Sequence, residues 1–482
     1  MIPERLRFLL SPDLPPAQLH EVFSQAGHQL YLVGGSVRDA FLERGLDDYT
    51  YDFDFATDAR PERIRRLLES WGDVVYSVGA TFGTIAAAKG KWTVEVTTFR
   101  NEVYRDDSRK PQVTFSDDIE TDLSRRDFTV NAMALSLMDL TPIDPFGGLT
   151  DLAAGVLRTP LDPRISFSED PLRMLRLFRF QATLGFEPDA GALKAVADMG
   201  DRLEIVSSER IRDELSKLLT ARPADEESGG AGAALAGVVR SGLADHFIPE
   251  LPALAMEQDP DQRHKDVLAH TLAVVDKTSP DDLVLRLAAL FHDIGKPDTR
   301  QFGKDGVSFH HHEVVGARIT RRRLKALRYP REVVDDVSRL VFLHLRPHTL
   351  KMGWTDSAVR RYVRDAGPLL DRLNELVRCD VTTANPRQAR AVQNRIDELE
   401  ERIAVLGEKE EIARLRAPID GHQVMAYLGI GPGPKIGDIM ALMLERRIDE
   451  GPYGVDEAYA MVREWAMEQG IPDPGPPPAE EE

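Results

Sequence analysis

Two aspartates that follow a diglycine turn could carry out chemistry on a nucleotide. The turn and the acids read Gly34-Gly35-Ser36-Val37-Arg38-Asp39 and Asp52-Phe53-Asp54. Glycines let backbone N–H groups approach a ligand closely, Ser36 can cap a helix, and a helix N-terminus favours phosphate, so the turn could hold a triphosphate. If residues 51–55 form a strand, Asp52 and Asp54 lie on one face. There they could share two Mg²⁺ ions that activate an attacking hydroxyl and steady a leaving pyrophosphate.

A simpler interpretation of these residues is also open. A tight turn followed by a strand edge with solvated acids would use the same residue types, and short motifs match by chance. The order and separation of the two motifs favour nucleotidyl transfer.

Several ordered blocks of sequence resemble one family. The turn and the acids resemble the head domain of bacterial tRNA nucleotidyltransferases, the CCA-adding enzymes and their poly(A) polymerase relatives in the polymerase-β superfamily. Further blocks follow in that family's order: Arg125-Arg126-Asp127-Phe128-Thr129-Val130-Asn131-Ala132, Asp144-Pro145-Phe146-Gly147-Gly148 and Glu169-Asp170-Pro171-Leu172-Arg173. They cover roughly the first 220 residues, and such a series makes a chance match improbable.

The resemblance suggests further residues of the active site. Glu95 lies in the middle of a predicted strand, where polymerase-β relatives often supply a third carboxylate; a salt-bridged glutamate on an edge strand is an equally good interpretation. Arg125 and Arg126 could bind triphosphate oxygens as bidentate donors, or form an ion pair with Asp127 at a helix N-terminus. The polar segment from Arg100 to Leu123 is, by resemblance, a flexible loop that some family members need to add adenosine.

A predicted helix carries an acid and a regular row of arginines. Asp170 and Arg173 are three residues apart and would share a helix face. A carboxylate that accepts beside a guanidinium that donates matches the amino group and ring nitrogen of cytosine or adenine, and would reject uracil and guanine. The alternative is an i, i+3 salt bridge, but the family context favours base selection. Arg176 and Arg179 continue the row and could hold phosphate or base.

Histidines and acids gather in one later stretch in an order suited to metal binding. A predicted apolar stripe of Leu283, Leu287, Leu290 and Ile294 carries the adjacent pair His292-Asp293. His270, His292, Asp293, His312, His344 and Asp380 occur in the order of HD-domain phosphohydrolases. The resemblance implies a site for Ni, Mn or Co, because imidazole favours these metals over Mg²⁺. The alternative is a degenerate domain kept for RNA binding or packing.

Composition limits where the protein works and what it binds. The net charge is −19 and Cys379 is the single cysteine, which excludes an intramolecular disulfide framework. No apolar stretch reaches the roughly 20 residues needed to span a bilayer, and we expect a cytosolic protein without a membrane partner. The acidic net charge argues against an RNA partner, but local basic clusters could bind phosphate. One such cluster is Arg318, Arg321, Arg322, Arg323, Lys325, Arg328 and Arg331.

The sequence predicts an α+β fold of several domains. A small mixed-sheet nucleotidyltransferase head (18–152) would precede a helical neck for nucleotide selection and RNA binding (153–260). A helical HD metal-binding domain (261–385), a helical tail (386–471) and a disordered end (472–482) would follow.

Local patterns predict the main elements. The patterns predict a capped helix over Thr57–Leu68, strands over 74–78, 84–88 and 93–97, and helices over 170–219. Residues 229–232, a glycine cluster, read as a flexible break. Apolar residues from Val392 to Leu406 recur at helical spacing, which indicates a long amphipathic helix. Residues 429–437 read as a connector between helices, or as a turn that touches RNA phosphates.

These expectations converge on one leading function. Asp52, Asp54 and Mg²⁺ would catalyse template-independent addition of C and A to the tRNA 3′ end, with ATP and CTP as substrates. Gly34, Gly35 and Arg38 would seat the triphosphate. Within the family, a CC-only or A-only enzyme or a poly(A) polymerase is the alternative. From other classes, the alternatives are an HD phosphohydrolase with a non-catalytic head and a non-catalytic RNA-binding protein. The oligomeric state is not predicted.

Overall fold

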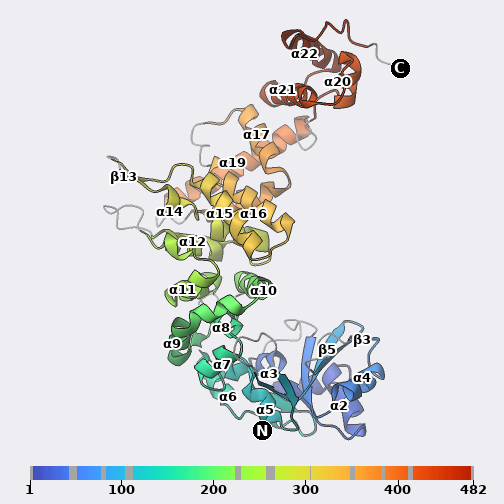
Figure 1. Cartoon of the computed structure of the whole chain (residues 1–482), viewed down its shortest axis with the longest axis vertical. Helices are drawn as coiled ribbons and strands as arrows, with labels where there is room; N and C mark the ends of the chain where they lie inside the picture. The colour runs from blue at the N-terminus through green and yellow to red at the C-terminus, as the bar shows by residue number, and fades with distance from the viewer. Residues whose placement is uncertain are drawn as a thin grey trace. The chain divides into compact units, whose positions relative to one another are not determined.

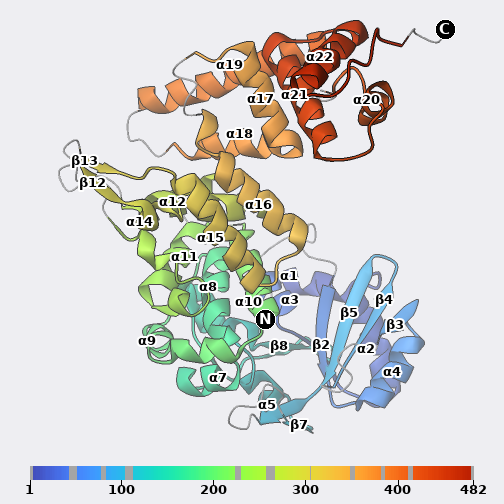
Figure 2. The same cartoon turned by 45° about the horizontal axis from the view of Figure 1, so that its top comes forward.

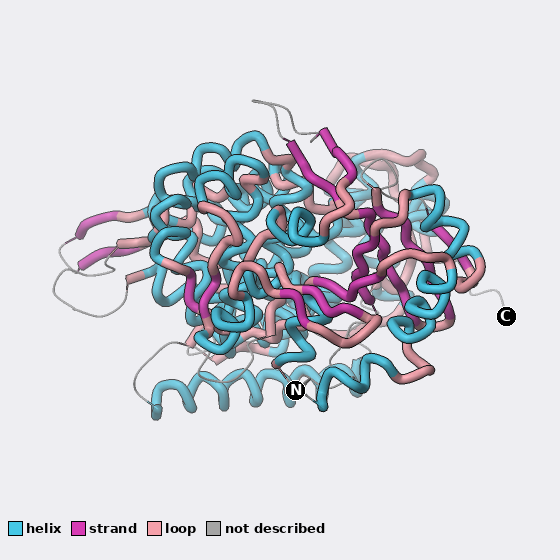
Figure 3. The backbone as a smooth tube through the Cα atoms, turned by 90° about the horizontal axis from the view of Figure 1, so that it is seen from below, coloured by secondary structure: helices cyan, strands magenta, loops and turns pink. Residues whose placement is uncertain are grey.

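The computed structural model describes most of the chain, which forms two compact units. The described residues are 4–42, 52–76, 83–103, 112–222, 230–256, 266–303, 306–347, 353–381, 386–410 and 416–478. The first unit comprises Met1–Ala255 and Arg323–Tyr329, and the second comprises Met256–Arg322 and Pro330–Glu482. The first unit holds the large β-sheet, whereas the second is mostly helical (Figure 3).

A seven-stranded mixed sheet lies in the first unit. Its order is β3-β4-β5-β2-β1-β8-β9; β2 and β5 run parallel, and the other neighbours run antiparallel. Figure 2 shows β2, β5, β4 and β3 side by side. The strands are β1 Leu30–Val33, β2 Asp52–Thr57, β3 Val74–Tyr76, β4 Thr84–Lys89, β5 Trp92–Thr98, β8 Ala134–Ser136 and β9 Pro142–Ile143. The sheet confirms the α+β fold predicted for the head.

Alternation along β2 sorts its side chains between the core and the site. Phe53 and Phe55 are 1% exposed, while Asp52 and Asp54 point away from them and are exposed. Helix α4 (Pro61–Glu69) packs on β3, β4 and β5. The other helices of this part are α1 Glu4–Arg7, α2 Pro15–Gln25, α3 Gly35–Phe41, α5 Ile119–Ser124 and α6 Gly148–Ala154, with 3₁₀ turns η1 Phe8–Leu10 and η4 Thr129–Asn131.

Two local predictions for the head are wrong. The helix predicted over Thr57–Leu68 begins only at Pro61, because β2 continues to Thr57. The segment predicted as a loop contains an antiparallel hairpin of β6 (Arg100–Val103) and β7 (Gln112–Phe115), followed by α5. The predicted strand over 74–78 is observed as far as Tyr76, and residues 77–78 lie outside the described part.

Helices α7 to α11 follow the sheet. Figure 1 shows α8 lying against α10 and α11. Gly237 of α11 allows this close approach, since a Cβ there would lie 2.6 Å from the ring of Phe178 on α8. The predicted break over 229–232 is wrong at 230–232, which form the first turn of α11. The elements are β10 Val156–Leu157, α7 Pro163–Glu169, α8 Leu172–Leu184, β11 Glu187–Pro188, α9 Ala190–Met199, η5 Gly200–Ile205, α10 Ser208–Leu219, α11 Gly230–Arg240, η6 Leu243–His246 and η7 Pro252–Leu254.

The second unit is built from helices, most of them amphipathic. A short hairpin of β12 (Gln301–Gly303) and β13 (Gly306–Ser308) interrupts them. None of the helices that the structure describes combines the length and apolar composition that crossing a bilayer requires. The helices are α12 Val267–Lys277, α13 Leu283–Phe291, α14 Lys296–Thr299, α15 His312–Ala326, α16 Arg331–Leu343, α17 Asp356–Ala366, η9 Gly367–Leu369, α18 Leu370–Cys379, α19 Pro386–Glu410, α20 Gly421–Leu428, α21 Pro434–Glu450 and α22 Val455–Glu468. Helix α15 ends in Arg323–Ala326, which belong to the first unit.

The C-terminal helices have an apolar core of their own. Val424, Ile439, Met443 and Val462 are fully buried in it. Helix α19 confirms the amphipathic helix predicted from Val392 to Leu406. The connector predicted over 429–437 is observed at 429–433, but residues 434–437 already belong to α21, so the prediction is wrong there.

The disorder predicted from Pro472 onward is wrong for the described residues 472–478. The Tyr427 hydroxyl donates to the Gly475 carbonyl at 2.6 Å. Arg463 Nε donates to Asp473 at 2.6 Å. The aromatic ring and the ion pair therefore hold a proline-rich segment that composition alone assigns to disorder.

Candidate active sites

Three carboxylates meet on the open face of the sheet. Asp52 and Asp54 lie on β2, and the parallel register places Glu95 of β5 directly beside Asp54. Loss of hydration raises the pKa of Asp54; Arg126 opposes this rise and Asp52 adds to it. Loss of hydration, then Asp54 and Asp52, raise the pKa of Glu95. Since β5 lies between β4 and β2, Glu95 is not on an edge strand. Oxygen donors that repel one another in this way suit Mg²⁺.

The diglycine turn lies beside these carboxylates. Gly34 has φ +72°, and a Cβ there would lie 3.1 Å from Arg126 Nη1 and 3.7 Å from Asp54 Oδ2. A side chain at this position would therefore crowd the guanidinium and the carboxylate. A helix begins at the turn, since Gly35 opens α3. The predicted Ser36 cap is wrong, because Gly34 is the N-cap and Ser36 lies inside the helix.

Arg38 is held inside the protein behind this turn. It is 8% exposed and donates to Asp39 at 2.8 Å and to Asn131 at 2.6 Å. Its guanidinium carbon lies 5.5 Å from the centre of the Phe180 ring. In this arrangement Arg38 fixes α3 to residues 129–131 and does not project from the turn.

Arg125 and Arg126 share one buried aspartate, Asp122, and not Asp127, which the alternative interpretation named as their partner. Arg125 Nη2 lies 2.6 Å and Arg126 Nη2 lies 3.2 Å from the Asp122 oxygens. Burial acts to raise the pKa of Asp122, but the two guanidiniums hold it below its ordinary value. Asp127 instead receives Arg176. The pairing with Asp122 aims Arg126 at the carboxylate site.

Asp170 and Arg173 do not form the helical pair that their spacing predicts. Asp170 follows α7 in an extended conformation (φ −138°, ψ 98°) and precedes the first turn of α8. Its Oδ2 accepts from Arg210 Nη2 at 2.7 Å, and its Oδ1 accepts from the backbone N–H of Leu172 at 3.2 Å. The extended conformation follows from Pro171, which disfavours the helical region for the residue before it.

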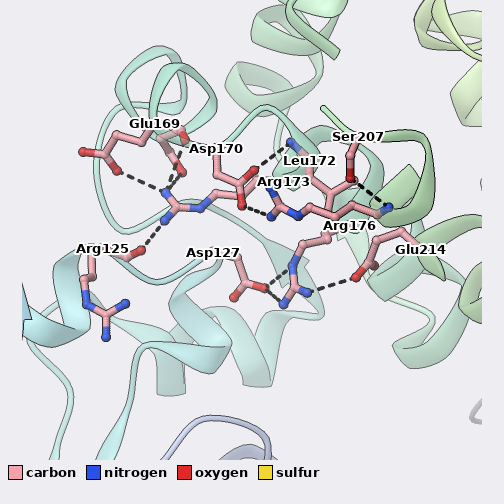
Figure 4. Close-up of polar contacts among 11 residues, drawn as sticks. Arg125, Asp127, Glu169, Asp170, Leu172, Arg173, Arg176, Ser207 and Glu214 are labelled. Carbon is pink, nitrogen blue, oxygen red and sulfur yellow. Dashed lines mark hydrogen bonds and ion pairs between the residues drawn. The ribbon is translucent and has the colours of Figure 1, made fainter. Parts of the chain in front are cut away.

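Arg173 is anchored by other groups (Figure 4). It is 7% exposed, and its Nη1 donates to Ser166 Oγ at 2.8 Å and to Glu169 at 3.3 Å. Its Nη2 donates to the Arg125 carbonyl. Arg173 therefore joins α7 and α8 to the segment that carries Arg125.

The remaining arginines of α8 form a buried charge network. Arg176 Nε donates to Asp127 at 3.0 Å, and its Nη1 lies 3.2 Å from Glu214 Oε1. Arg179 Nε lies 2.7 Å from Glu214 Oε2. Burial and the charge of Arg176 lower the pKa of Arg179 to about 10, although Glu214 opposes this. The Arg179 guanidinium lies 4.0 Å from the Phe180 ring centre.

Sequence reasoning missed Glu214, Arg210, Asp122 and Phe180. The signal for Glu214 was available, since it lies among Ile211, Leu215 and Leu218 on the apolar side of α10. A charged residue at such a position needs a buried partner. The partners of Glu214 are Arg176 and Arg179 of α8, and the sequence of α10 does not identify them.

The six residues predicted for the HD site are brought together in the second unit. Asp293 is central: its two oxygens face two ligand groups, His270 with His292 and His312 with His344. The distances are His270 Nε2–Asp380 Oδ1 2.9 Å, His270 Nε2–His292 Nε2 3.2 Å, His292 Nε2–Asp293 Oδ2 3.2 Å, His312 Nε2–His344 Nε2 3.3 Å and His312 Nε2–Asp293 Oδ1 3.4 Å. Nitrogen and oxygen donors so close together fit divalent transition metals.

Backbone carbonyls orient three of these histidines. The Nδ1 atoms of His292, His312 and His344 lie 2.6–2.8 Å from the carbonyls of residues 289, 309 and 341. Each Nδ1–H donates outward, so each Nε2 faces the cluster. Burial opposes protonation of His292, but Asp293 and Asp380 raise its pKa to about 10. The carboxylates of Asp293 and Asp380 therefore favour a positive charge in the cluster, which a metal ion can supply.

The local chain path explains this convergence. Helix α13 ends at Phe291, so His292 and Asp293 lie beyond its end and not on its predicted apolar stripe. Gly295 packs against the start of α15, where a Cβ would lie 2.2 Å from the His312 carbonyl and 2.6 Å from the Gly316 nitrogen. Only glycine permits this approach. Lys296 Nζ lies 2.7 Å from Asp293 Oδ2.

Comparison with protein families matches three parts of the chain. Residues 30–158 match "Poly A polymerase head domain", residues 185–254 match "Probable RNA and SrmB- binding site of polymerase A", and residues 263–385 match "HD domain". Together with the carboxylate site, these matches define a nucleotidyltransferase with a polymerase head and an HD domain.

Similarity to individual proteins narrows this class. The A-adding tRNA nucleotidyltransferase of Deinococcus radiodurans is 33% identical over 452 residues, which cover 91% of this chain and 95% of that protein. The chain therefore belongs to the tRNA nucleotidyltransferase family. The CCA-adding enzymes of Streptococcus gordonii and Bacillus subtilis are 44% and 43% identical over 45% and 42% of this chain, and the chain spans 52% and 49% of their lengths.

Solved structures agree with this assignment. The Bacillus stearothermophilus CCA-adding enzyme in complex with CTP aligns with a TM-score of 0.65 and 25% identity, over 95% of this chain and 99% of that chain. The Thermotoga maritima CCA-adding enzyme complexed with tRNA aligns with a TM-score of 0.56 at 17% identity, over 95% and 98%, which supports the fold alone.

Proposed function

We propose that the protein adds C and A to the 3′ end of tRNA, with CTP and ATP as substrates. The observation that carries this proposal is the cluster of Asp52, Asp54 and Glu95 beside the Gly34 turn and Arg126. The related enzymes are named for A addition or CCA addition, and one similar structure holds CTP. We expect the protein to act in the cytoplasm, where tRNA is available.

The residues of the head have distinct tasks in this proposal. Mg²⁺ would be held by Asp52 and Asp54, with Glu95 as a third carboxylate, and would supply activation of the attacking hydroxyl and charge for the leaving pyrophosphate. The Gly34-Gly35 turn and Arg126 would bind the triphosphate. Arg125, paired with Asp122, would act beside Arg126, and Arg38 would act indirectly by holding the turn.

Base selection is proposed for Asp170 and Arg173 in a revised form. Each oxygen of Asp170 accepts one N–H in this structure, which leaves lone pairs for the amino group of cytosine or adenine. Arg173 would donate to the neighbouring ring nitrogen. Arg176 and Arg179 would shape the pocket from α8, since Asp127 and Glu214 hold them in place.

The test uses tRNA transcripts that end before the first C, after CC and after CCA. Each transcript is incubated with purified protein and one nucleoside triphosphate at a time, and the products are sized. The proposal expects C addition to the first transcript, A addition to the second and no addition to the third. Incorporation of UTP or GTP at comparable rates would contradict it.

A-only addition is the second candidate, and the nearly full-length similarity to the Deinococcus radiodurans A-adding enzyme favours it. The same transcripts separate the candidates, because an A-only enzyme extends the CC transcript with ATP and leaves the shorter transcript unchanged with CTP.

We also propose that the histidine cluster is a separate phosphohydrolase site for Ni²⁺, Mn²⁺ or Co²⁺. The proposal rests on His270, His292, Asp293, His312, His344 and Asp380, whose donor atoms converge. Its test is hydrolysis of 2′,3′-cyclic nucleotides and bis-p-nitrophenyl phosphate with each metal. No hydrolysis with any metal would leave the cluster with a structural or RNA-binding role. The intact carboxylates of the head argue against a protein that acts only as a hydrolase.

A further inference from the structure

A cavity of about 700 Å³, widely open to solvent, lies between α15, α16 and the junction of α17 with η9. All of its lining residues belong to the second unit. Figures 1 and 2 both show α15 beside α16, and Val341 of α16 faces Gly316 of α15. The cavity is not part of the nucleotidyltransferase head, and no family match gives it a role.

Helical spacing separates this cavity from the metal cluster. The two helices contribute sets that each recur at i, i+3, i+4 and i+7: Val314, Ala317, Arg318 and Arg321 from α15, and Asp335, Ser338, Arg339 and Phe342 from α16. Such residues share one helix face. His312 and His344 lie about half a turn away from these faces at 100° per residue. The two helices therefore present the cavity on one side and metal ligands on the other.

Four arginines give the rim of the cavity a positive character. Arg321 pairs with Asp335, and Arg364 Nε donates to Asp365 Oδ1 at 3.0 Å. Arg339 donates through Nε and Nη2 to the Asp365 carbonyl at 3.0 and 2.8 Å.

The arginines at the rim of the cavity outnumber the acids. Asp335, Asp336 and Asp365 are the three lining acids, and Arg331 and Arg346 from outside the lining also pair with two of them. Arg318 is exposed, and within the described residues no ion pair or hydrogen bond engages it. Its guanidinium is therefore available to an anion at the rim.

Apolar side chains and an aromatic ring also line the cavity. They include Ala366 and Leu369, which are 3% and 5% exposed, and Phe342. The Arg339 guanidinium carbon lies 6.0 Å from the centre of the Phe342 ring. Guanidiniums bind phosphate by charge and hydrogen bonds, while an aromatic face stacks on a nucleobase. A volume of this size suits a small ligand, since such pockets measure about 300–1,000 Å³.

We propose that this cavity binds a nucleoside phosphate, at a site separate from both the head and the metal cluster. Arg318 meets the phosphate at the rim, with Arg321 and Arg364 beside it. The base enters against Phe342 and Leu369. This occupancy does not depend on nucleotide addition by the head or on hydrolysis at the histidine cluster.

The test is photolabelling of the full-length protein with 8-azido-AMP, followed by mass spectrometry of the labelled peptides. We expect label in peptides that contain residues 314–321 or 338–342, and protection by AMP that exceeds protection by adenosine or inorganic phosphate alone. Because the label is mapped, nucleotide bound in the head is counted separately. Label confined to the head would overturn the proposal.

Two substitutions sharpen this test. Arg318→Glu should reduce labelling of the cavity peptides at least tenfold, because it reverses the charge at an exposed position and leaves the core intact. Arg361→Ala is the matched control: Arg361 lies on α17, is 46% exposed and pairs with Asp449 outside the cavity. Equal labelling of the parent and the Arg318 variant would also overturn the proposal, and circular dichroism checks that both variants are folded.

Discussion

Replacing Glu214 by glutamine should destabilise the first unit strongly. Glu214 is 4% exposed and lies 3.2 Å from Arg176 and 2.7 Å from Arg179. Glutamine keeps the volume but removes the negative charge between two guanidiniums. Burial of charge is already unfavourable at Arg179 in the parent protein. Its side chain is 16% exposed and its pKa is lowered to about 10.

The magnitude follows from these contacts. A pKa lowered by roughly 2.5 corresponds to ~3 kcal/mol of unfavourable burial and charge repulsion at Arg179, which remains after the attraction of Glu214 has opposed it. Breaking a buried pair by removing one partner costs about 3–5 kcal/mol, so we expect a loss of ~3 kcal/mol in the free energy of unfolding. For a unit of this size, this loss lowers the melting temperature by about 6–12 °C.

The assay is differential scanning calorimetry of the full-length variant, in which the transition of the first unit is followed. Asp198→Asn is the matched control, because Asp198 is 33% exposed and its pairs with Arg164 and Lys194 are at the surface. Such pairs contribute about 0–1 kcal/mol. If Glu214→Gln shifts the transition no more than the control does, the buried network does not support the fold as inferred.

Three further predictions concern the two sites. Glu95→Ala should lower nucleotide incorporation by ~10²-fold, and a normal rate in this variant would show that Glu95 has only a structural role. The activity of the parent protein should fall as the pH decreases through the raised pKa values of Asp54 and Glu95, because protonation removes metal ligands. Asp170→Ala should lose discrimination against UTP and GTP while metal-dependent transfer continues, and unchanged selectivity in single-nucleotide assays would refute this. His292→Ala combined with Asp293→Ala should abolish phosphate ester hydrolysis and leave nucleotide addition intact; loss of both activities in a folded variant would show that the sites are not independent.

Strand periodicity predicted the carboxylate face of the head, and the resemblance to HD-domain phosphohydrolases supplied the residues of the histidine cluster. The alternation of Asp52, Phe53 and Asp54 gives the correct face of β2, because strand geometry fixes which side chains point together. The order of His292, Asp293 and His312 identified residues that meet in space. Only the first of these is geometric information carried by a local pattern, because the second rests on the family resemblance.

Long-range partners could not be predicted in this way. The sequence shows Asp170 before Pro171, a signal against helix that outweighs the i, i+3 spacing to Arg173. It gives no sign that Arg210 binds Asp170 from α10, since the two are 40 residues apart. Likewise, the sequence gives no sign that residues 230–232 belong to helix α11, whose Gly237 packs against Phe178 of α8.

The central claim is that the head transfers nucleotides through its paired aspartates. The most direct measurement compares ATP and CTP incorporation into tRNA transcripts by the parent protein and by Asp54→Ala. Asp54 lies beside Glu95 and near Arg126 and Gly34. Its removal would eliminate a proposed metal ligand and the negative charge that faces Arg126. We predict a loss of ~10³-fold or more with tRNA binding retained. Incorporation within tenfold of the parent would contradict the account.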